Sequence, residues 1–323
     1  MSDLFGLVFP FFGLIFLGYF CGWLVKLPEA GLAWLTFFII YVALPALFYR
    51  IVAQTPFEEL ANPAFILAAV LSTATAAAVA LGVGLWFRGG NVGEAAIATA
   101  VGAYANVGYM GPGLSLAALG LGAATPAALI FACDSLLFFT LVPLLMATRG
   151  RGESLPATLL LIARRVFTHP FNIATLLGVL AAAFHFHEPD AVARMLDFLK
   201  NAAAPCALFT LGVTVALRPL RRIPIELVPL LALKLVGQPA IALLALSLVG
   251  SVSRGWSPAW AQTMLLMAAL PPALNCFVLA RQYHTYVEEA STAVLIGTVC
   301  SVFTVTAMLY LLRAGLIPLD LLQ

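Results

Sequence analysis

Residues 104–115 read Y-A-N-V-G-Y-M-G-P-G-L-S. They interrupt an apolar run, Ala95–Leu119, that is otherwise long enough to cross a bilayer. The stretch holds three glycines and Pro112. Proline has no N–H to donate and clashes with the carbonyl one turn back, so we expect the helix to break there. Because unpaired backbone groups are costly in hydrocarbon, such a break persists only against protein or a water-filled cavity.

A second apolar run, Met264–Arg281, reads M-L-L-M-A-A-L-P-P-A-L-N-C-F-V-L-A-R and is interrupted by Pro271 and Pro272. Two broken membrane helices, one in each half of a chain, are typical of the binding site of a secondary transporter. The helix that follows each break begins near the midplane, and its free N–H groups carry partial positive charge that attracts anions. Pro272 suits the first turn of such a helix, where a missing N–H costs nothing.

The composition is that of a membrane protein, with 63% hydrophobic and only 9% charged residues among 323. A soluble domain has roughly 25% charged residues. Connections are short throughout, so residues 1–323 are expected to form a single polytopic domain. Ten predicted spans follow from the apolar runs: Phe5–Val25, Gly31–Ile51, Ala64–Phe87, Ala95–Leu119, Ala123–Ala147, Pro170–Phe186, Ala191–Leu217, Ile223–Val249, Ala259–Ala280 and Val287–Leu312.

The distribution of basic residues predicts that both termini lie outside. With that orientation, four arginines fall at outer span ends: Arg50, Arg194, Arg254 and Arg313. Ten basic residues fall at inner ends: Lys26, Arg88, Arg149, Arg151, Arg164, Arg165, Arg218, Arg221, Arg222 and Arg281. Since basic residues favour the cytoplasmic side, the loop at about 148–169 is expected in the cytoplasm.

The two halves of the chain resemble each other. A shift of 160 residues places Pro10 on Pro170, Pro45 on Pro205 and Pro112 on Pro272. Five spans per half is an odd number, so repeat 1 (about 1–148) and repeat 2 (about 170–323) must be inverted relative to each other. The expected fold is therefore an all-α membrane protein of two inverted five-helix repeats, with broken helices 4 and 9 crossing, as in sodium/proton antiporters and bile-acid symporters.

Three motifs resemble the auxin efflux carrier family: N-V-G-Y-M-G-P-G-L at 106–114, L-P-P-A-L-N-C-F-V-L-A at 270–280 and A-S-T-A-V-L-I-G-T-V-C-S-V-F-T at 290–304. The family includes plant PIN auxin exporters and bacterial carriers of malonate or malate, and the resemblance spans the whole chain. It implies that helices 1, 2, 6 and 7 form a scaffold and that helices 3, 4, 5, 8, 9 and 10 form a moving transport domain. It also implies a location in a bacterial inner membrane.

The residues at the two breaks are the candidate substrate-binding set. Asn106 and Asn275 flank the breaks and can both donate and accept hydrogen bonds. They are predicted to contact substrate, although they would also suit a purely structural role of satisfying the broken backbone. Tyr109 and Met110 are expected to shape the pocket wall, and Pro112 and Pro272 to set the breaks.

Two charged residues, Asp134 and Lys234, fall well away from the ends of their predicted spans. A charge at that depth costs at least about 2.5–3.5 kcal/mol unless it is paired or faces a cavity, so each is a candidate coupling residue. Gln238 lies one turn from Lys234 on the same helix face. Lys234 could instead be a structural tether, snorkel outward, or occupy the place of a sodium ion. A buried lysine that gains and loses a proton would suit a proton-coupled carrier.

The predicted function is secondary active transport of a small organic anion, a carboxylate or dicarboxylate such as malonate or malate, or an auxin-like acid. We expect an elevator-type motion coupled to protons, with sodium as the other candidate ion. The protein is expected to be surrounded by membrane lipid. A homodimer that forms through contacts between the scaffold helices fits this architecture. The alternatives are a sodium-coupled symporter of the bile-acid type and a non-transporting membrane sensor. No enzymatic activity, cofactor, metal or nucleic acid is expected, because no catalytic motif or Walker loop is present.

Overall fold

The computed structural model describes residues 2–26, 28–60, 62–148, 170–217, 223–253 and 256–318, together with residues 160, 164 and 168. The expected cytoplasmic loop at 148–169 lies almost entirely outside the described residues. Seven arginines of the charge count also lie outside them: Arg149, Arg151, Arg165, Arg218, Arg221, Arg222 and Arg254.

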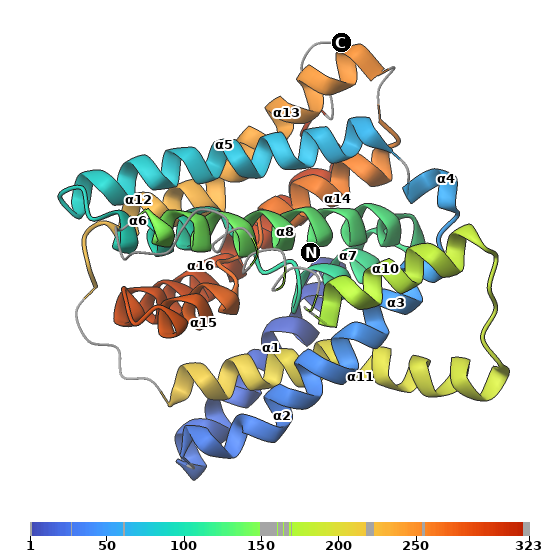
Figure 1. Cartoon of the computed structure of the whole chain (residues 1–323), viewed down its shortest axis with the longest axis horizontal. Helices are drawn as coiled ribbons and strands as arrows, with labels where there is room; N and C mark the ends of the chain where they lie inside the picture. The colour runs from blue at the N-terminus through green and yellow to red at the C-terminus, as the bar shows by residue number, and fades with distance from the viewer. Residues whose placement is uncertain are drawn as a thin grey trace. The chain divides into compact units, whose positions relative to one another are not determined.

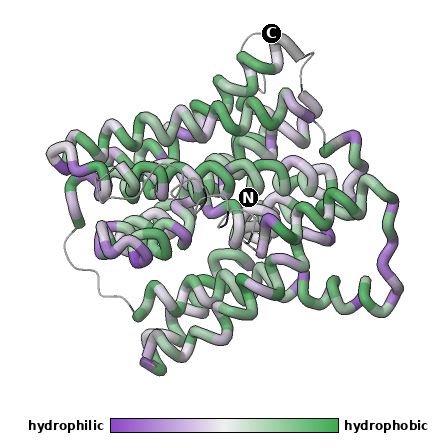
Figure 2. Tube along the Cα trace, viewed as in Figure 1, coloured by the Kyte–Doolittle hydropathy of each residue, from purple (hydrophilic) through white to green (hydrophobic). Residues whose placement is uncertain are grey.

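The described chain is helical, and apolar residues dominate most of its helices (Figures 1 and 2). In the described part of the chain, the only extended pairing is one isolated bridge between Ala105 and Pro272. Helices suit a membrane because every backbone N–H and C=O inside them is satisfied within the same segment. The expectation of an all-α membrane protein is confirmed.

Six helical segments of the described chain are long and apolar enough to span a membrane: Ala30–Ala53, Pro63–Phe87, Leu121–Ala147, Asp190–Ala216, Leu227–Gly250 and Val287–Arg313. They coincide with the second, third, fifth, seventh, eighth and tenth predicted spans. Shorter apolar helices at Phe9–Val25 and Asn172–Ala183 fall within the first and sixth predicted spans, and one at Val92–Ala103 begins three residues before the fourth and overlaps its first part. The ninth consists of two short helices, α14 (Pro258–Ala268) and α15 (Leu274–Gln282).

The chain divides into two compact units, each assembled from separate stretches of sequence. Unit 1 comprises Met1–Asn62, Gly108–Ala132 and Phe167–Pro219. Its helices are α1 (Ser2–Val25), α2 (Ala33–Phe38), α3 (Leu44–Ala53), α4 (Phe57–Leu60), α7 (Gly111–Leu119), α10 (Pro170–Ala183), α11 (Asp190–Ala216) and the first part of α8 (Ala124–Ala147). Short 3-10 turns at Glu29–Leu32 and Leu121–Ala123 and a π-helical turn at Ile39–Ala43 connect them.

In unit 1, α1 and α11 pack with their backbones nearly touching. A Cβ atom added at Gly212 would lie 2.0 Å from the carbonyl oxygen of Ile15, and one at Gly18 would lie 2.1 Å from that of Phe209. Such close approach is how small residues promote helix association in lipid. Arg50 of α3 adds a polar tie to the same unit, because it pairs with Asp197 through two hydrogen bonds of 3.0 Å and also contacts Glu188.

Unit 2 comprises Pro63–Val107, Cys133–Val166 and Leu220–Gln323. Its helices are α5 (Pro63–Phe87), α6 (Val92–Ala103), the second part of α8, α12 (Leu227–Ala232), a π-helical turn η4 (Leu233–Gly237), α13 (Gln238–Ser253), α14, α15 and α16 (Val287–Arg313). α5 packs along both α6 and α13. A Cβ added at Gly102 of α6 would lie 2.7 Å from that of Ala80 on α5, so the small residue sets how closely these helices approach.

Candidate functional site

Two helices of unit 2 stop in the middle of apolar segments. α6 ends at Ala103, and Tyr104 already has an extended backbone with ψ 103°. α14 ends at Ala268, and the next helix, α15, begins only at Leu274. Both runs are therefore interrupted, close to the positions expected from their glycines and prolines.

The prolines take different places from those predicted. α6 ends well before Pro112, which lies in the first turn of the following helix, α7. Pro272 lies in the extended segment before the N-cap residue Ala273, so its predicted first-turn position is wrong. Proline is tolerated in the first turn of a helix, because the backbone N–H at that position would have no helical partner. Pro112 occupies such a position in α7, whereas Pro272 had been predicted to occupy one.

The two interrupted segments hydrogen-bond to each other in place of the missing helical bonds. The Asn106 amide donates to the Pro271 carbonyl at 2.8 Å, and the Ala273 amide donates to the Tyr104 carbonyl at 2.9 Å. Together they form the antiparallel bridge between Ala105 and Pro272. Broken backbone at membrane depth is stable only when it is satisfied within protein, and here each break partly satisfies the other. We call this meeting point the crossing.

Lys234 and Gln238 join the carbonyl ends of the two interrupted helices. Lys234 is fully buried, and its Nζ donates to the Ala268 carbonyl at 2.8 Å and to Gln238 Oε1 at 2.6 Å. Gln238 Nε2 donates in turn to the Ala103 carbonyl at 3.0 Å. Ala103 and Ala268 are the last residues of α6 and α14, where carbonyls lack helical partners and the helix dipole is negative. Snorkelling of Lys234 to the surface is excluded by its burial.

A π-helical turn carries Lys234. The segment Leu233–Gly237 between α12 and α13 is wound more loosely than an α-helix. Such turns are rare and are often found at functional sites. The turn places a lysine and, four residues later, a glutamine beside the same pair of helix ends.

Asp134 is the second buried charge of unit 2. Its Oδ1 accepts a hydrogen bond of 2.8 Å from Thr73 Oγ1 on α5, and the residue is 2% exposed. No direct ion pair joins Asp134 to Lys234, both of which are described residues. A carboxyl group and an amine thus lie buried in the same unit without direct contact.

Tyr104 and Ser135 belong to the crossing although the sequence did not single them out as site residues. Asn275 Nδ2 donates to the Tyr104 hydroxyl at 3.2 Å, and that hydroxyl lies 3.5 Å from Ser135 Oγ. The Tyr104 ring stacks on Phe138 with centroids 4.6 Å apart. Two features of the sequence could have pointed to these residues: Tyr104 lies directly before the break, and Ser135 directly follows Asp134.

The structure places the predicted substrate-binding residues in different units. Asn106, Pro272 and Asn275 gather in unit 2, where Asn106 is buried and Asn275 is half-buried. Tyr109, Met110 and Pro112 belong to unit 1, where Tyr109 and Met110 are buried at the start of α7. The candidate site therefore comprises the three residues of unit 2.

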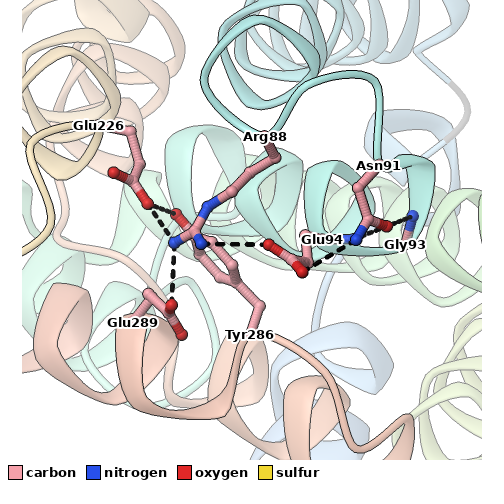
Figure 3. A network of polar contacts seen from close by, with 7 residues as sticks. All are labelled: Arg88, Asn91, Gly93, Glu94, Glu226, Tyr286 and Glu289. Carbon is pink, nitrogen blue, oxygen red and sulfur yellow. Dashed lines mark hydrogen bonds and ion pairs between the residues drawn. The ribbon is translucent and has the colours of Figure 1, made fainter.

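A separate polar network ties four elements of unit 2 together around Arg88 (Figure 3). The Arg88 guanidinium contacts Glu94 at 3.2 Å, Glu289 at 2.9 Å and Glu226, and it lies 4.7 Å from the ring centroid of Tyr286. Burial alone would lower the pKa of Arg88, but its contacts with Tyr286 and the carboxylates outweigh this effect and raise that pKa. Arg88 therefore stays charged and holds the ends of α5, α6 and α16 to the segment before α12.

Residues 3–309 match the family described as "Membrane transport protein". The chain belongs to this family. A protein of Rhizobium meliloti (strain 1021) named "Putative malonate transporter" is 49% identical over 322 residues, which cover 99% of both chains.

The plant relatives are more distant members of the same group. Auxin efflux carrier component 1 of Arabidopsis thaliana is 27% identical over 48% of this chain and 25% of its own length. Auxin efflux carrier component 8 of the same plant is 27% identical over 51% of this chain and 45% of its own. The resemblance to the auxin efflux carrier family is confirmed, and the family indicates a membrane transporter and not an enzyme.

Among the described residues, no group of three or more His, Cys, Asp or Glu side chains is arranged to hold a metal ion. The cysteines are free thiols. The polar groups that the described residues place at the crossing are amides, the Tyr104 and Ser135 hydroxyls, two helix ends and the Lys234 side chain.

Proposed function

We propose that this protein is a secondary active transporter that moves a small dicarboxylate of the malonate type across a bacterial inner membrane. The observation that carries the proposal is the crossing, where two interrupted membrane helices meet inside an apolar unit. Irregular backbone at that depth is typical of the binding sites of secondary transporters. The relative named for malonate, similar over nearly its full length, supports the choice of substrate.

The anion would bind at the start of α15. The first amides of a helix have no helical partners and carry partial positive charge, which favours a carboxylate. Ala273, the N-cap residue, offers no side-chain bond to these amides. Asn275 in the first turn of α15 and Asn106 in the opposite segment would orient the carboxylate oxygens.

Lys234 would couple transport to protons. Its ammonium is the cation that compensates the negative ends of α6 and α14, so the loss of its proton would weaken the bonds that join those ends. Asp134 is a second acceptor for a proton in the same interior. In this proposal the lysine occupies the position that a sodium ion would take in the alternative, bile-acid type of symporter.

Unit 2 is proposed as the moving transport domain and unit 1 as the scaffold of an elevator-type mechanism. The division into units supports this assignment because the helices of predicted spans 1, 2, 6 and 7 all fall in unit 1. α7 and the first part of α8 also cluster in unit 1, which differs from the predicted assignment of helices 4 and 5. The ten-span inverted repeat, the outside location of both termini and a scaffold-mediated homodimer are parts of the same proposal.

Counterflow in proteoliposomes tests the proposed function. Vesicles preloaded with unlabelled malonate should take up labelled malonate faster than empty vesicles. Malate and indole-acetate are the competing substrates, each measured with and without sodium and with an imposed pH gradient. We expect malonate exchange that needs no sodium and accumulation that follows the proton gradient.

Two outcomes would contradict the proposal. Exchange that requires sodium would favour the bile-acid type of symporter. Absence of counterflow for all three acids, in vesicles that hold folded protein, would favour a sensor without transport.

A further inference from the structure

Asp134 is a buried carboxyl group with no cation in contact with it. The residue is 2% exposed, and among the described residues Thr73 alone hydrogen-bonds to its carboxyl, at 2.8 Å. No ion pair of the described chain includes Asp134. An ionised carboxylate in apolar surroundings with a single neutral partner is so costly that the group takes up a proton instead. Asp134 is therefore held in this structure as the neutral acid.

The charge of Lys234 is balanced by other groups. Its Nζ donates to the Ala268 carbonyl and to Gln238, which donates in turn to the Ala103 carbonyl. Ala103 and Ala268 are the last residues of two helices, and each such helix end carries about half a negative charge. Because two helix ends offset one ammonium, Lys234 leaves no positive charge over for Asp134.

A charge on Asp134 would be felt at the crossing. The next residue, Ser135, places its Oγ 3.5 Å from the Tyr104 hydroxyl, and that hydroxyl lies 3.2 Å from Asn275 Nδ2. Two side-chain contacts thus lead from the neighbour of Asp134 to the crossing. In an apolar interior little water screens charges, so an ionised Asp134 and an anion at the crossing would repel each other.

We propose that Asp134 takes up one proton with each substrate anion and carries it across the membrane, in addition to the proton that Lys234 would exchange. Binding effects are reciprocal: an anion that binds better beside neutral Asp134 must also favour the protonation of Asp134. With two protons for each malonate dianion, a transport cycle moves no net charge. This inference rests on the proposed function, because it places the substrate at the crossing.

Lys234 stays necessary in this scheme. Without its ammonium, an anion would have to enter beside two uncompensated negative helix ends. Asp134 therefore adds a proton to the cycle and does not replace Lys234.

Three other ionisable side chains of unit 2 lie near enough to interact with a charge on Asp134: Tyr104, Cys133 and Lys234. Phenol and thiol groups are uncharged near neutral pH. The helix α5, which brings Thr73 to the carboxyl, has no ionisable side chain. Of these three groups, Lys234 alone could add a pH dependence of its own, so a variant that changes only Asp134 separates the two.

Calorimetric titration of the purified protein with malonate counts the protons that are linked to binding. At pH values above the second pKa of malonate, the ligand stays a dianion and does not titrate. Each proton that binding requires then lowers the affinity by up to about tenfold for each pH unit, so two protons give up to about a hundredfold. We expect this steeper dependence in the wild type.

Asp134→Asn is a permanently neutral isostere of the protonated acid, and its carbonyl can still accept from Thr73. It should bind malonate as the wild type does at the lowest pH of the series, and lose at most about tenfold in affinity for each pH unit above it. Thr73→Val is the matched control. It removes the same hydrogen bond but keeps the carboxyl, so it should retain the wild-type slope.

Accumulation of malonate in proteoliposomes gives the proton count independently. Across a difference of one pH unit, with the membrane potential held at zero, the wild type should reach about hundredfold accumulation and Asp134→Asn about tenfold. Without a pH gradient, an inside-positive potential should drive malonate into vesicles that hold Asp134→Asn and should have no effect on the wild type. These responses to voltage are a readout that a purely structural role of Asp134 would not produce.

Equal pH slopes or equal accumulation in the wild type and Asp134→Asn would overturn the assignment of a proton to Asp134 and leave the proposed function standing. A slope reduced equally in Thr73→Val would overturn it too, because the hydrogen bond would then be the cause. Titration of the wild type alone, in buffers of different ionisation enthalpy, tests the proposal if Asp134→Asn does not fold: uptake of no more than one proton on binding would contradict it. Failure of the folded wild type to bind or exchange malonate would overturn the proposed function itself.

Discussion

Replacing Lys234 with methionine should abolish the accumulation of malonate against a gradient. Methionine removes the only cation at the ends of α6 and α14 among the described residues, and with it the proposed coupling group. The Ala268 carbonyl and Gln238 Oε1 would lose a buried donor, which typically costs about 1–3 kcal/mol. The melting temperature should therefore fall, but the fold should persist.

Two further variants separate the coupling role of Lys234 from its structural role. Gln238→Leu breaks the bond to the Ala103 carbonyl and keeps the charge, so it should lower the melting temperature while uphill transport survives. Lys200→Met removes a half-buried lysine of unit 1. It should change neither the melting temperature nor the uphill transport of malonate. The measurements are malonate accumulation under a pH gradient and thermal unfolding. If Lys234→Met still concentrates malonate with an unchanged pH dependence, Lys234 is not the coupling group.

Gly297→Ala should reduce transport by about tenfold or more. A Cβ at Gly297 would lie 2.5 Å from Pro272 Cδ, 3.0 Å from Pro272 Cγ and 3.2 Å from Leu231 Cδ2. The rigid proline ring cannot rotate away, so the segment that forms the bridge with Ala105 has to shift. Overpacking of this kind typically costs about 1–3 kcal/mol, and here the displacement falls on the proposed binding segment.

Gly82→Ala is the matched control for this substitution. Gly82 also lies within a long helix of unit 2, but a Cβ there would meet nothing within 4 Å. Its transport rate should match that of the wild type, and its stability should stay equal or rise slightly because alanine favours helix. Equal transport rates in the two glycine variants would show that the position of Pro272 does not matter.

Composition and proline placement were enough to predict the class of fold and the two interruptions. Long apolar runs with very few charges are typical of membrane helices, and closely spaced glycines and prolines favour a break. A single proline is not sufficient, because Pro10, Pro143 and Pro205 lie inside continuous helices. The exact ends were not predictable. α6 stops well before Pro112 because the Tyr104 carbonyl and the Asn106 amide find better partners across the crossing, at Ala273 and Pro271. Partners from the other half of the chain leave no local signal in the sequence.

The same limit applies to the side chains of the site. Lys234 and Gln238 were recognisable because a charge and an amide at membrane depth are rare and lie one turn apart. Tyr104 and Ser135 were not singled out, because a tyrosine and a serine in an apolar run are ordinary residues until the fold brings Asn275 to them. The Arg88 network was hidden for the same reason, since its three carboxylates come from widely separated stretches.

The central claim is that a small carboxylate binds at the crossing, and direct titration with malonate tests it. A hydrogen bond to a charged group is typically worth about 1.5–3 kcal/mol, so Asn106→Ala and Asn275→Ala should each weaken malonate binding roughly ten- to hundredfold. Asn172→Ala, in α10 of unit 1, is the control and should bind like the wild type. Both crossing variants should keep melting temperatures close to that of the wild type. Wild-type affinity in both of them would contradict binding at the crossing.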